Sequence, residues 1–358
     1  MELAKKHVLG CYYSGYPTWK LPYSGTVPVC AHSLRTNIVY GMLKFLPDRL
    51  RPSSRSLFLW QDHAFDRWVA RRLERCDYVH ALPGQCLATF QSARKQGIRT
   101  VLNHATGPVV HWVKIMRPEY ARVGLDMETV SPFDAAYFLR EAEEYALADF
   151  HCAASTVVRD QLVERGIPAH RIWVVGYGAD TNIFHPGNTP ASVSFRIIFC
   201  GAVGLRKGIR TLLTALEEAG RQDWEMHFYG PKLPESKMDI AAYNGSTKLE
   251  FHGAVRQQKL AEAFRQGSVL VLPSLEEGFG LVIPQALNCG LPCIVSDRVG
   301  GKDLIKHHEN GSIFPSGDSA TLLAELRHWE RETRRPSGLH EWKRPACDML
   351  TMSEKHLS

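Results

Sequence analysis

The stretch Leu272-Pro-Ser-Leu-Glu-Glu-Gly-Phe-Gly-Leu-Val-Ile-Pro-Gln-Ala-Leu-Asn-Cys-Gly290 predicts a buried strand, an acidic loop with glycines and a helix in direct succession. Gly278 and Gly280 would let the backbone of the loop approach a ligand closely, because glycine has no side chain. The amides of Phe279, Gly280 and Leu281 would lie at the start of the helix. Free N–H groups and the helix dipole stabilise a phosphate at such a position.

Charged side chains accompany this loop. A carboxylate at Glu277 repels a bare phosphate, so we expect it to accept hydrogen bonds from sugar hydroxyls. A second strand-loop-helix stretch, Phe199-Cys-Gly-Ala-Val-Gly-Leu-Arg-Lys-Gly208, places Arg206 and Lys207 where a departing diphosphate needs cations. Its spacing matches neither a P-loop nor the GxGxxG pattern of nicotinamide and flavin sites. Alone, the pair is best interpreted as solvated; beside the 277–281 loop it predicts a diphosphate site.

Apolar runs typical of strands alternate with helical segments along the whole chain, which predicts an α/β fold with parallel sheets. In the second half we expect strands at 195–200, 226–229, 249–252, 269–272 and 292–295. In the first half we expect strands at 7–13, 57–60, 78–81, 100–103 and 150–153, and helices at 88–96, 132–148 and 156–165. Between them the turn-rich stretch 184–192 reads as a linker.

The linker predicts two doubly wound domains that face each other across a cleft. We expect an N-terminal domain over 1–185, a C-terminal domain over 186–335, and a tail over 336–358 that crosses back onto the first domain. In such sheets ligands bind outside the carboxyl ends of the strands, so the chemistry should lie in the loops that follow them.

Composition excludes several classes of protein. The chain has 358 residues, 44% of them hydrophobic, and no apolar run long enough for a membrane span. Its nine cysteines are scattered without a CxxC pair, which indicates reduced thiols in a cytoplasmic protein rather than a disulfide scaffold. The sixteen histidines form no HExxH motif and are interpreted as surface or core residues, so no metal site is expected.

The motifs together resemble those of a known family. They are 140–149 followed by Ala154-Ser155, then 174–186, Arg206-Lys-Gly208, Phe251-His-Gly253 and Pro273–Gly280. In this order they resemble the retaining glycosyltransferases of the GT-B fold, family four, over most of the chain. The resemblance implies two Rossmann-like domains, a nucleotide-sugar donor held mainly by the second domain, and no cofactor.

The resemblance also assigns roles to residues. It implies that Arg206 and Lys207 contact the diphosphate and that Glu277 contacts the donor sugar. The family usually has a glutamate for the nucleotide ribose where this chain has Gln285. An amide still accepts a hydrogen bond but without charge assistance, a loss of about 1 kcal/mol. The donor site implied by the resemblance further includes Gly204, Gly230, Gly253 and Gly278 to Leu281.

In the first domain, the resemblance points to the loop after the strand at 100–103. We expect His104 to contact the donor sugar, with His111 as the competing choice. Ser14 and Gly15 stand where the family has a glycine loop near the phosphates or the acceptor, although the usual double glycine is absent.

Charge distribution bears on the acceptor. Residues 1–125 hold 18 Lys and Arg against 7 Asp and Glu, so this part of the chain is basic. Arg67, Arg71 and Arg75 would share one face of a helix, which fits an anionic membrane or a phosphorylated acceptor as well as a merely solvated face. We therefore expect a cytoplasmic protein that contacts the membrane loosely and glycosylates a lipid-linked or polysaccharide precursor or a small molecule.

The resemblance implies transfer with retention, and the residues themselves predict a reaction without a metal. The chain contains no DxD motif of the kind that holds a divalent metal in other nucleotide-sugar enzymes, and cationic side chains would stabilise the departing diphosphate. Two alternatives stay open, a nucleotide-sugar 2-epimerase, which needs no acceptor, and a nucleotide-sugar-binding protein without activity. Only the basic first domain favours a nucleic-acid binder, and no nucleic-acid partner is expected, because the sequence has neither interleaved aromatic RNA-binding motifs nor a helix-turn-helix signature.

Overall fold

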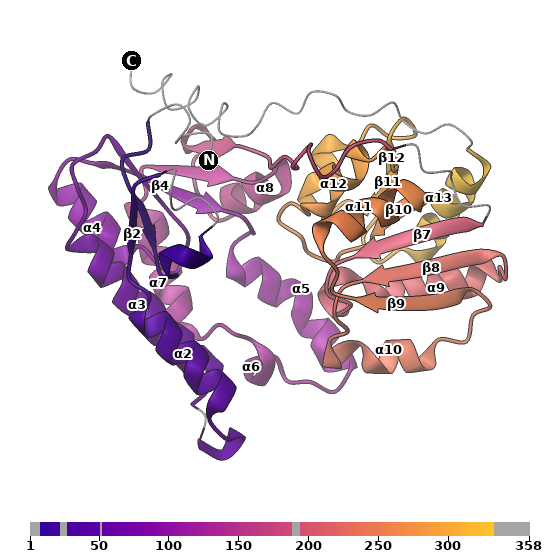
Figure 1. Ribbon diagram of the computed structural model, residues 1–358, viewed down its shortest axis with the longest axis horizontal. Helices are drawn as coiled ribbons and strands as arrows, with labels where there is room; N and C mark the ends of the chain where they lie inside the picture. The colour runs from indigo at the N-terminus through magenta and orange to yellow at the C-terminus, as the bar shows by residue number, and fades with distance from the viewer. Residues whose placement is uncertain (1–7, 22–26, 51, 188–193, 333–358) are drawn as a thin grey trace.

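The structure, a computed structural model, describes residues 8–21, 27–50, 52–187 and 194–332, which fold into two α/β domains (Figure 1). The strands are β1 (Tyr12–Ser14), β2 (Val29–Ala31), β3 (Tyr78–Ala81), β4 (Arg99–His104), β5 (Phe150–Ala153), β6 (Ile172–Val174), β7 (Phe195–Cys200), β8 (Trp224–Tyr229), β9 (Lys248–Gly253), β10 (Val269–Leu272), β11 (Cys293–Ser296) and β12 (Gly311–Phe314). The helices are α2 (Leu34–Phe45), α3 (Ser54–Ala70), α4 (Leu87–Lys95), α5 (Val109–Arg122), α6 (Met127–Val130), α7 (Ala135–Leu147), α8 (Thr156–Glu164), α9 (Ile209–Ala219), α10 (Lys237–Ala242), α11 (Gln257–Gln266), α12 (Val282–Asn288) and α13 (Ser319–Arg331). Short 3-10 helices are η1 (Thr18–Lys20), η2 (Asp48–Leu50), η3 (Ala169–Arg171), η4 (Leu205–Lys207), η5 (Pro234–Ser236) and η6 (Gly300–Leu304).

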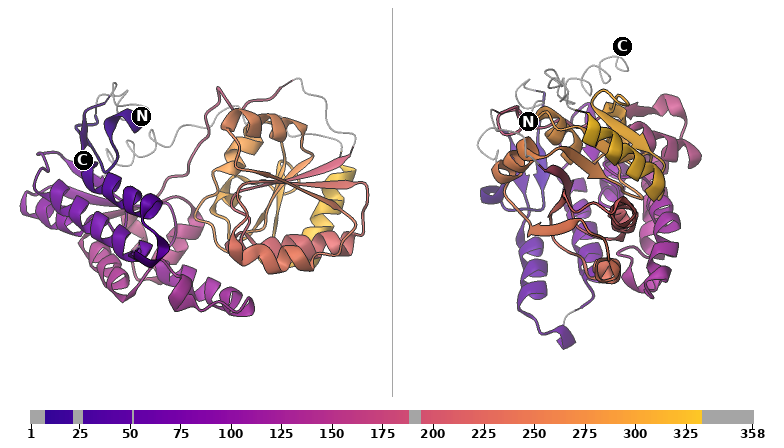
Figure 2. Two further views of the ribbon diagram at one scale, coloured as in Figure 1. Left: turned by 60° about the horizontal axis from the view of Figure 1, so that its bottom comes forward. Right: turned by 90° about the vertical axis from the view of Figure 1, so that its right-hand side faces the viewer.

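The C-terminal domain is built on a six-stranded parallel sheet in the order β12-β11-β10-β7-β8-β9. Helices cover both faces of this sheet, as Figure 2 shows with the strands seen nearly end-on. One face packs under α9 and α13, and the other under α11 and α12. The strand order turns back at β7, so that β8 and β9 lie to one side and β10 to β12 to the other. The predicted doubly wound architecture is therefore confirmed in this domain.

Most strands of this sheet are buried, which explains why they could be predicted from apolar runs in the sequence. All four residues of β10 and of β11 are buried. Helices cover both faces of a parallel sheet, so its inner strands read as continuous apolar runs. Ile209, Leu212, Leu213 and Leu216 form one stripe of α9 that is buried against β7 and β8. β12 was not among the predicted strands.

The N-terminal domain differs from the prediction in its sheet. Strands β3, β4, β5 and β6 form a four-stranded parallel sheet in sequential order, and β1 and β2 form a separate two-stranded sheet. The expected strand at 57–60 is wrong: these residues lie inside α3, whose Ser53 cap accepts a hydrogen bond from the Ser56 amide. Leu57, Ala64 and Val69 are buried along one side of α3, so the helical period overrides the short apolar run.

Several contacts join the two domains on the described residues. The Ser155 hydroxyl donates to the carbonyl of Gly278 at 2.7 Å, and the Thr156 amide donates to Asp303 at 2.8 Å. On another side of the junction, Arg122 at the end of α5 forms two parallel hydrogen bonds with Asp239 of α10, at 2.7 and 2.8 Å.

The chain passes between the domains near the predicted linker. Phe184 is 1% exposed and packs with Phe264 of α11, so it already belongs to the core of the C-terminal domain. Residues 188–192 of the predicted linker and the tail expected over 336–358 lie outside the described residues.

Candidate functional site

The point where the strand order reverses fixes the place of the site. β7 and β10 are parallel neighbours in the sheet although β8 and β9 come between them in the chain, and their carboxyl ends therefore lie side by side. In open α/β sheets this topological switch point is where ligands bind. The loop after β7 continues into η4, which carries Arg206 and Lys207, and the loop after β10 carries Glu277.

The structure brings Arg206, Lys207 and Glu277 together. Lys207 Nζ and Arg206 Nη1 both contact the same carboxylate oxygen, Oε2 of Glu277, and the distance from Arg206 is 3.2 Å. The Lys207 and Glu277 side chains are 12% and 14% exposed, and that of Arg206 is 36% exposed. Two cations thus converge on one carboxylate at a partly open edge, where an anion from solution can reach them.

Glu276 is a further charged residue of the site that the sequence analysis did not single out. Its carboxylate contacts Arg206 Nη1 at 3.3 Å, and its backbone carbonyl accepts a hydrogen bond from the same nitrogen at 3.0 Å. The side chain is buried, and this burial raises the pKa of Glu276. Glu276 therefore positions Arg206 from behind, whereas Glu277 lies on the more open side. The two adjacent glutamates carry no sequence signal that separates these roles.

The 277–281 loop leads into α12 as predicted, with the helix beginning at Val282. Gly280 has φ +88°, a left-handed conformation that favours glycine. Gly301 donates to the carbonyl of Phe279 at 2.6 Å, and Gly300 to that of Glu277 at 2.9 Å, which anchors the loop to η6. Among the described residues, none accepts a hydrogen bond from the amides of Phe279, Gly280 or Leu281.

The structure requires glycine at position 278 for a reason other than the predicted close approach of a ligand. A Cβ atom at this position would lie 2.1 Å from the carbonyl oxygen of Ala105 and 2.6 Å from Cα of Thr106. These are backbone atoms of the loop after β4, in the other domain. The glycine therefore permits the two domains to meet backbone to backbone, and it brings the loop after His104 against the loop that holds Glu277.

The three other predicted glycines line the carboxyl edge of neighbouring strands. Gly230 follows β8 with φ +144°, and its amide donates to the carbonyl of Gly253 at the end of β9. A Cβ at Gly230 would meet the Gly201 carbonyl at 2.0 Å, so the chain crossing is tight here. Gly204 caps η4 and lies close to Leu233 and Glu235. All three thus lie beside the loop that carries Arg206 and Lys207.

Gln285 lies one turn into α12 and is partly exposed, whereas its neighbours Pro284 and Ala286 are buried. Its side chain is therefore on the accessible side of the helix that follows the Glu277 loop. No described residue forms a side-chain hydrogen bond with it. The geometry is compatible with the ribose contact that the resemblance implies.

The structure places His104 differently from the prediction. Its ring is 1% exposed, with Nε2 2.9 Å from Nδ1 of His151 and an edge-to-face contact with Tyr145. Burial lowers the pKa of His104 well below its usual range and that of His151 to about 4. In this arrangement His104 has no surface open to a sugar, and its loop, rather than its side chain, reaches the site. The competing choice, His111, is 18% exposed on α5, with Nδ1 3.7 Å from Glu164.

Ser14 and Gly15 belong to the separate two-stranded sheet. Ser14 is 3% exposed and accepts a hydrogen bond from the Tyr16 amide at 3.0 Å. Gly15 packs beside Thr36 and Phe65, in α2 and α3. Their described contacts are all within the N-terminal domain, so the structure does not bring them to Glu277.

The motif at 140–149 has a structural explanation. The Glu144 carboxylate accepts from the amides of Gly84, Cys86 and Leu87 at 2.5, 3.0 and 3.1 Å, which satisfies the start of α4. Arg140 holds that carboxylate at 3.1 Å and also contacts Asp66 at 2.5 Å. This part of the motif therefore builds the N-terminal domain rather than a ligand site.

The arginine face expected over residues 67–75 is also corrected. α3 ends at Ala70, with Arg71 as its C-cap, so Arg75 lies beyond the helix. Arg67, Arg71 and Arg75 therefore do not form one helical face. The helical period was extended past the end of α3 because residues 71–75 contain no glycine or proline that would mark the end of the helix.

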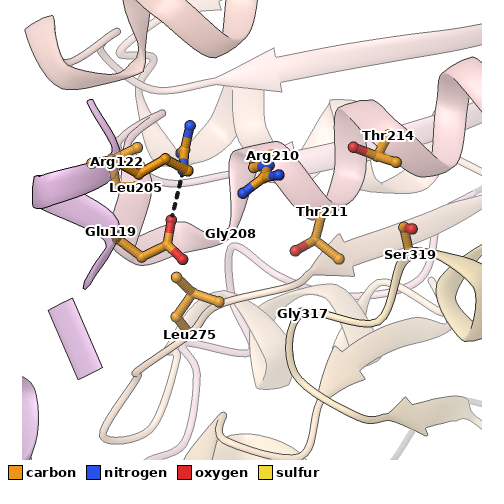
Figure 3. Close-up of a pocket in the computed structure, with 10 residues that line it drawn as sticks. All are labelled: Glu119, Arg122, Leu205, Gly208, Arg210, Thr211, Thr214, Leu275, Gly317 and Ser319. Carbon is orange, nitrogen blue, oxygen red and sulfur yellow. Dashed lines mark hydrogen bonds and ion pairs between the residues drawn. The ribbon is translucent and has the colours of Figure 1, made fainter. Parts of the chain in front are cut away.

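A pocket of about 250 Å³ lies beside the charged cluster, between α5 and the start of α9 (Figure 3). Leu205 and Gly208, which flank Arg206 and Lys207, border it, and the Glu119–Arg122 ion pair closes one side. Gly208 has φ +68°, and a Cβ there would meet the Pro273 carbonyl at 1.9 Å. The remaining lining residues are Arg210, Thr211, Thr214, Leu275, Gly317 and Ser319. None of the predicted site residues lines this pocket.

Comparison with known proteins bears directly on this charged cluster. Residues 194–330 match the family described as glycosyl transferases group 1. This match covers the C-terminal domain, from the start of its sheet to its last helix. Every residue of the Arg206, Lys207 and Glu277 cluster lies inside the group 1 domain.

Curated relatives extend the similarity. The chain is 28% identical over 222 residues to the lipopolysaccharide 1,6-galactosyltransferase of Escherichia coli, covering 58% of this chain and 59% of that protein. It is 27% identical over 242 residues to the D-inositol 3-phosphate glycosyltransferase of Streptomyces bingchenggensis, covering 61% and 53%. The aligned part thus spans about half to three fifths of the length of these relatives.

Solved structures show the fold beyond the group 1 domain. HepE from Anabaena, in complex with UDP and glucose, superimposes with a TM-score of 0.63 at 15% identity, over 93% of this chain and 87% of that one. Sucrose-phosphate synthase from Thermosynechococcus elongatus gives a TM-score of 0.61 at 19% identity, over 88% and 81%. The two-domain arrangement is therefore the GT-B fold that the sequence analysis predicts.

Proposed function

We propose that this chain is a metal-independent, retaining glycosyltransferase that moves a sugar from a nucleotide-sugar to a hydroxyl acceptor. The observation that carries the proposal is the convergence of Arg206 and Lys207 on Glu277 at the switch point of the group 1 domain. The named activities of the curated relatives support it, and the complexes of HepE with UDP and UDP-glucose make a UDP-sugar the first donor to test.

The charge arrangement accounts for the chemistry that such a transfer needs. Breaking the anomeric bond leaves negative charge on the diphosphate and positive charge on the sugar ring. Arg206 and Lys207 would turn from Glu277 to the diphosphate and stabilise its developing charge. α12 has only seven residues, so these two side chains, rather than its dipole, would supply most of that stabilisation. Glu277, released from the cations, would accept hydrogen bonds from the sugar.

The acceptor is proposed to enter on the side of the N-terminal domain. The loop at Ala105 and Thr106 lies against Gly278 and forms the opposite wall of the site. An acceptor hydroxyl beside this loop would approach the same face of the sugar that the diphosphate leaves, which gives retention. Two side-chain cations can carry the charge that a metal ion carries in other enzymes, and the sequence has no DxD motif to hold one.

A thermal-shift screen with UDP-, GDP- and ADP-sugars tests the donor site first. A bound donor stabilises the folded chain by about 2.7 kcal/mol at a hundred times its dissociation constant, so one nucleotide class should raise the melting temperature. The matched control is Glu218→Ala, an exposed glutamate on α9, which should keep the shift that Glu277→Ala and Lys207→Ala lose. A chain that none of these donors stabilises would contradict the proposal.

A second candidate, a nucleotide-sugar-binding protein without transfer activity, has one observation in its favour. Gln285 stands where the resembled family usually has a glutamate. Under this alternative the donor would still stabilise the chain, but no product would form with any acceptor. Product analysis after incubation with the stabilising donor alone also separates the third possibility, a 2-epimerase, which would convert the donor without an acceptor.

We further propose that the acceptor is lipid-linked and that α2 lies on an anionic membrane. Leu34, Ile38 and Phe45 are exposed at spacings of four and seven residues, whereas Thr36 and Val39 face the core. An apolar stripe that faces solvent on a helix is typical of an interfacial helix. Lys44 lies 5.2 Å from the Phe45 ring and would reach the head groups. This surface replaces the arginine face that the sequence predicted.

Vesicle sedimentation tests this contact. Phe45→Glu should abolish binding to vesicles with anionic lipid, because it places a charge in the apolar stripe. Met238→Glu, an exposed apolar residue of the other domain, is the control and should bind as the wild type does. Equal binding of both variants would contradict the role of α2. Within the described part of the chain, every helix is too short or too polar to cross a bilayer.

A further inference from the structure

A cluster of histidine and glutamate side chains lies at the edge of the six-stranded sheet, away from Glu277. Met226, Phe228, Leu249 and Phe251 pack on the face covered by α9. Because side chains alternate along a strand, His227 of β8 and Glu250 and His252 of β9 point to the opposite face. β9 is the last strand of the sheet, so this face is only partly covered: His227 is buried, and His252 is 27% exposed.

Three potential ligand atoms converge in this cluster. Nδ1 of His227 lies 2.9 Å from Nε2 of His252 and 3.6 Å from Oε2 of Glu250, and the remaining pair is 3.9 Å apart. Around a tetrahedral Zn²⁺ with bonds of about 2.0–2.1 Å, ligand atoms are separated by about 3.3–3.4 Å. The observed separations bracket this value, so shifts of about half an ångström would complete the coordination.

A second layer of charged groups orients these atoms. Glu225 Oε2 lies 3.2 Å from Nε2 of His227, and a carboxylate can only accept, so that nitrogen carries the proton. Nδ1 of His227 then has a lone pair that faces the cluster and accepts the hydrogen bond from Nε2 of His252. Arg196 holds Glu225 in turn at 3.0 Å. Carboxylate–histidine pairs of this kind accompany metal-ligating histidines.

The other two groups are similarly prepared. Lys248 contacts Oε1 of Glu250 at 2.6 Å, which leaves Oε2 for the cluster. The Lys248 side chain is 73% exposed and can withdraw into solvent when a cation arrives. The His252 ring is stacked on Tyr229, with ring centres 4.5 Å apart, which limits its rotation. Its neutral ring needs only to move its proton from Nε2 to Nδ1 in order to bind a metal.

We propose that His227, Glu250 and His252 bind one transition-metal ion of the Zn²⁺ class, with water as the fourth ligand. Two imidazoles and a carboxylate suit Zn²⁺ rather than Mg²⁺ or Ca²⁺, which prefer oxygen ligands. The ion would cross-link the edge strand β9 to β8 one residue before Gly253, which pairs with Gly230. The site is separate from the proposed transfer reaction and does not depend on it.

A second histidine cluster among the described residues supplies a matched control. His307, His308 and Glu325 also lie close together, but on the surface of the domain. Nδ1 of His307 already accepts a hydrogen bond from the Ile313 amide at 3.2 Å, and His308 is held at φ +60°. This cluster lacks a buried member, since none of the three residues is buried. We therefore expect it to contribute little to metal affinity.

Calorimetric titration of the EDTA-treated, full-length chain with Zn²⁺ tests the proposal. The wild type should bind Zn²⁺, His252→Ala and Glu250→Gln should each bind at least tenfold more weakly, and His308→Ala should bind as the wild type does. Because His252 and Glu250 are partly exposed, both variants should melt at the wild-type temperature without zinc, which shows that they fold.

Three results would overturn the proposal. They are a wild type that binds no Zn²⁺, binding in His252→Ala and Glu250→Gln equal to that of the wild type, or binding lost in His308→Ala alone. Donor binding is measured in the same preparations without zinc, so failure of the metal site is distinguishable from failure of the proposed transferase activity. In that experiment the His252→Ala chain should give the same thermal shift with the donor as the wild type.

Discussion

The two domains use parallel sheets in different ways. In the C-terminal domain the strand order reverses at β7, so that two loops far apart in the chain, those of Arg206 and Glu277, meet at one edge. In the N-terminal domain strands β3 to β6 follow one another in order, and the strands described for that sheet show no such reversal. Its polar side chains are placed by helix packing and capping instead. Topology thus fixes the charged site in one domain, whereas the other supplies a wall and an exposed apolar helix.

Removing a cation from the point where the strand order reverses at β7 should have the largest effect. Lys207→Ala should lower the rate of transfer roughly 10²- to 10³-fold, the cost of removing one group that stabilises developing charge. Glu277→Ala should also abolish measurable transfer, and both variants should keep the wild-type melting temperature, because neither side chain is in the core. Initial rates with the stabilising donor measure the loss. Full activity of either variant would remove that residue from the site.

Acid should destabilise the N-terminal domain through the buried His104–His151 pair. Burial holds the pKa of His151 at about 4, below the 6.5 of the unfolded chain. As the pH falls from about 6.5 to 4, His151 binds a proton in the unfolded chain but stays mostly neutral in the folded chain. The free energy of unfolding therefore decreases over this range. The loss attributable to His151 is roughly 2–3 kcal/mol.

Urea unfolding at pH 7 and pH 4 measures this difference. His151→Asn should lose less stability between the two pH values than the wild type does. His170→Asn, which removes an exposed histidine of η3, should follow the wild type. The same pH dependence in all three chains would contradict the assignment to the buried pair.

The smallest expected effect concerns Gln285. Gln285→Glu should tighten donor binding by about 1 kcal/mol, or roughly fivefold, because a carboxylate makes a charge-assisted hydrogen bond to a ribose hydroxyl. Donor titration by calorimetry measures the change, with Glu218→Ala as a control of unchanged affinity. A large loss of affinity would show that the amide itself is recognised, and that this helix differs from its counterpart in the resembled family.

Five of the six strands of the C-terminal domain could be predicted from the sequence to within about two residues, and β12 was missed. β7 and β10 match the expected bounds, because strands buried on both faces read as unbroken apolar runs. The same rule fails at residues 57–60, since a run of four apolar residues has the same appearance in a buried helix. The three-residue strands β2 and β6 are too short to give a pattern of their own.

The sequence could predict those residues of the candidate site that lie together within one loop. Arg206, Lys207 and Glu277 could be named because strand, loop and helix follow one another directly in each stretch. The burial of His104 could not, because it depends on His151 and Tyr145, which reach it only through the packing of β5 and α7. The sequence analysis did not single out His227, Glu250 and His252, which we propose to bind a metal, for a similar reason. Its residues come from two strands, and only the register of β8 against β9 aligns them.

Gly278 changes how tolerance to substitution around the site is to be understood. Any side chain at position 278 would collide with the backbone of Ala105 and Thr106. The carbonyl of Gly278 also accepts a hydrogen bond from the Ser155 hydroxyl, which fixes the backbone there. A mutational scan will therefore find position 278 intolerant for a reason unrelated to carbohydrate. That intolerance would persist in a descendant that had lost every ligand, because it reports how the two halves of the molecule are seated on each other.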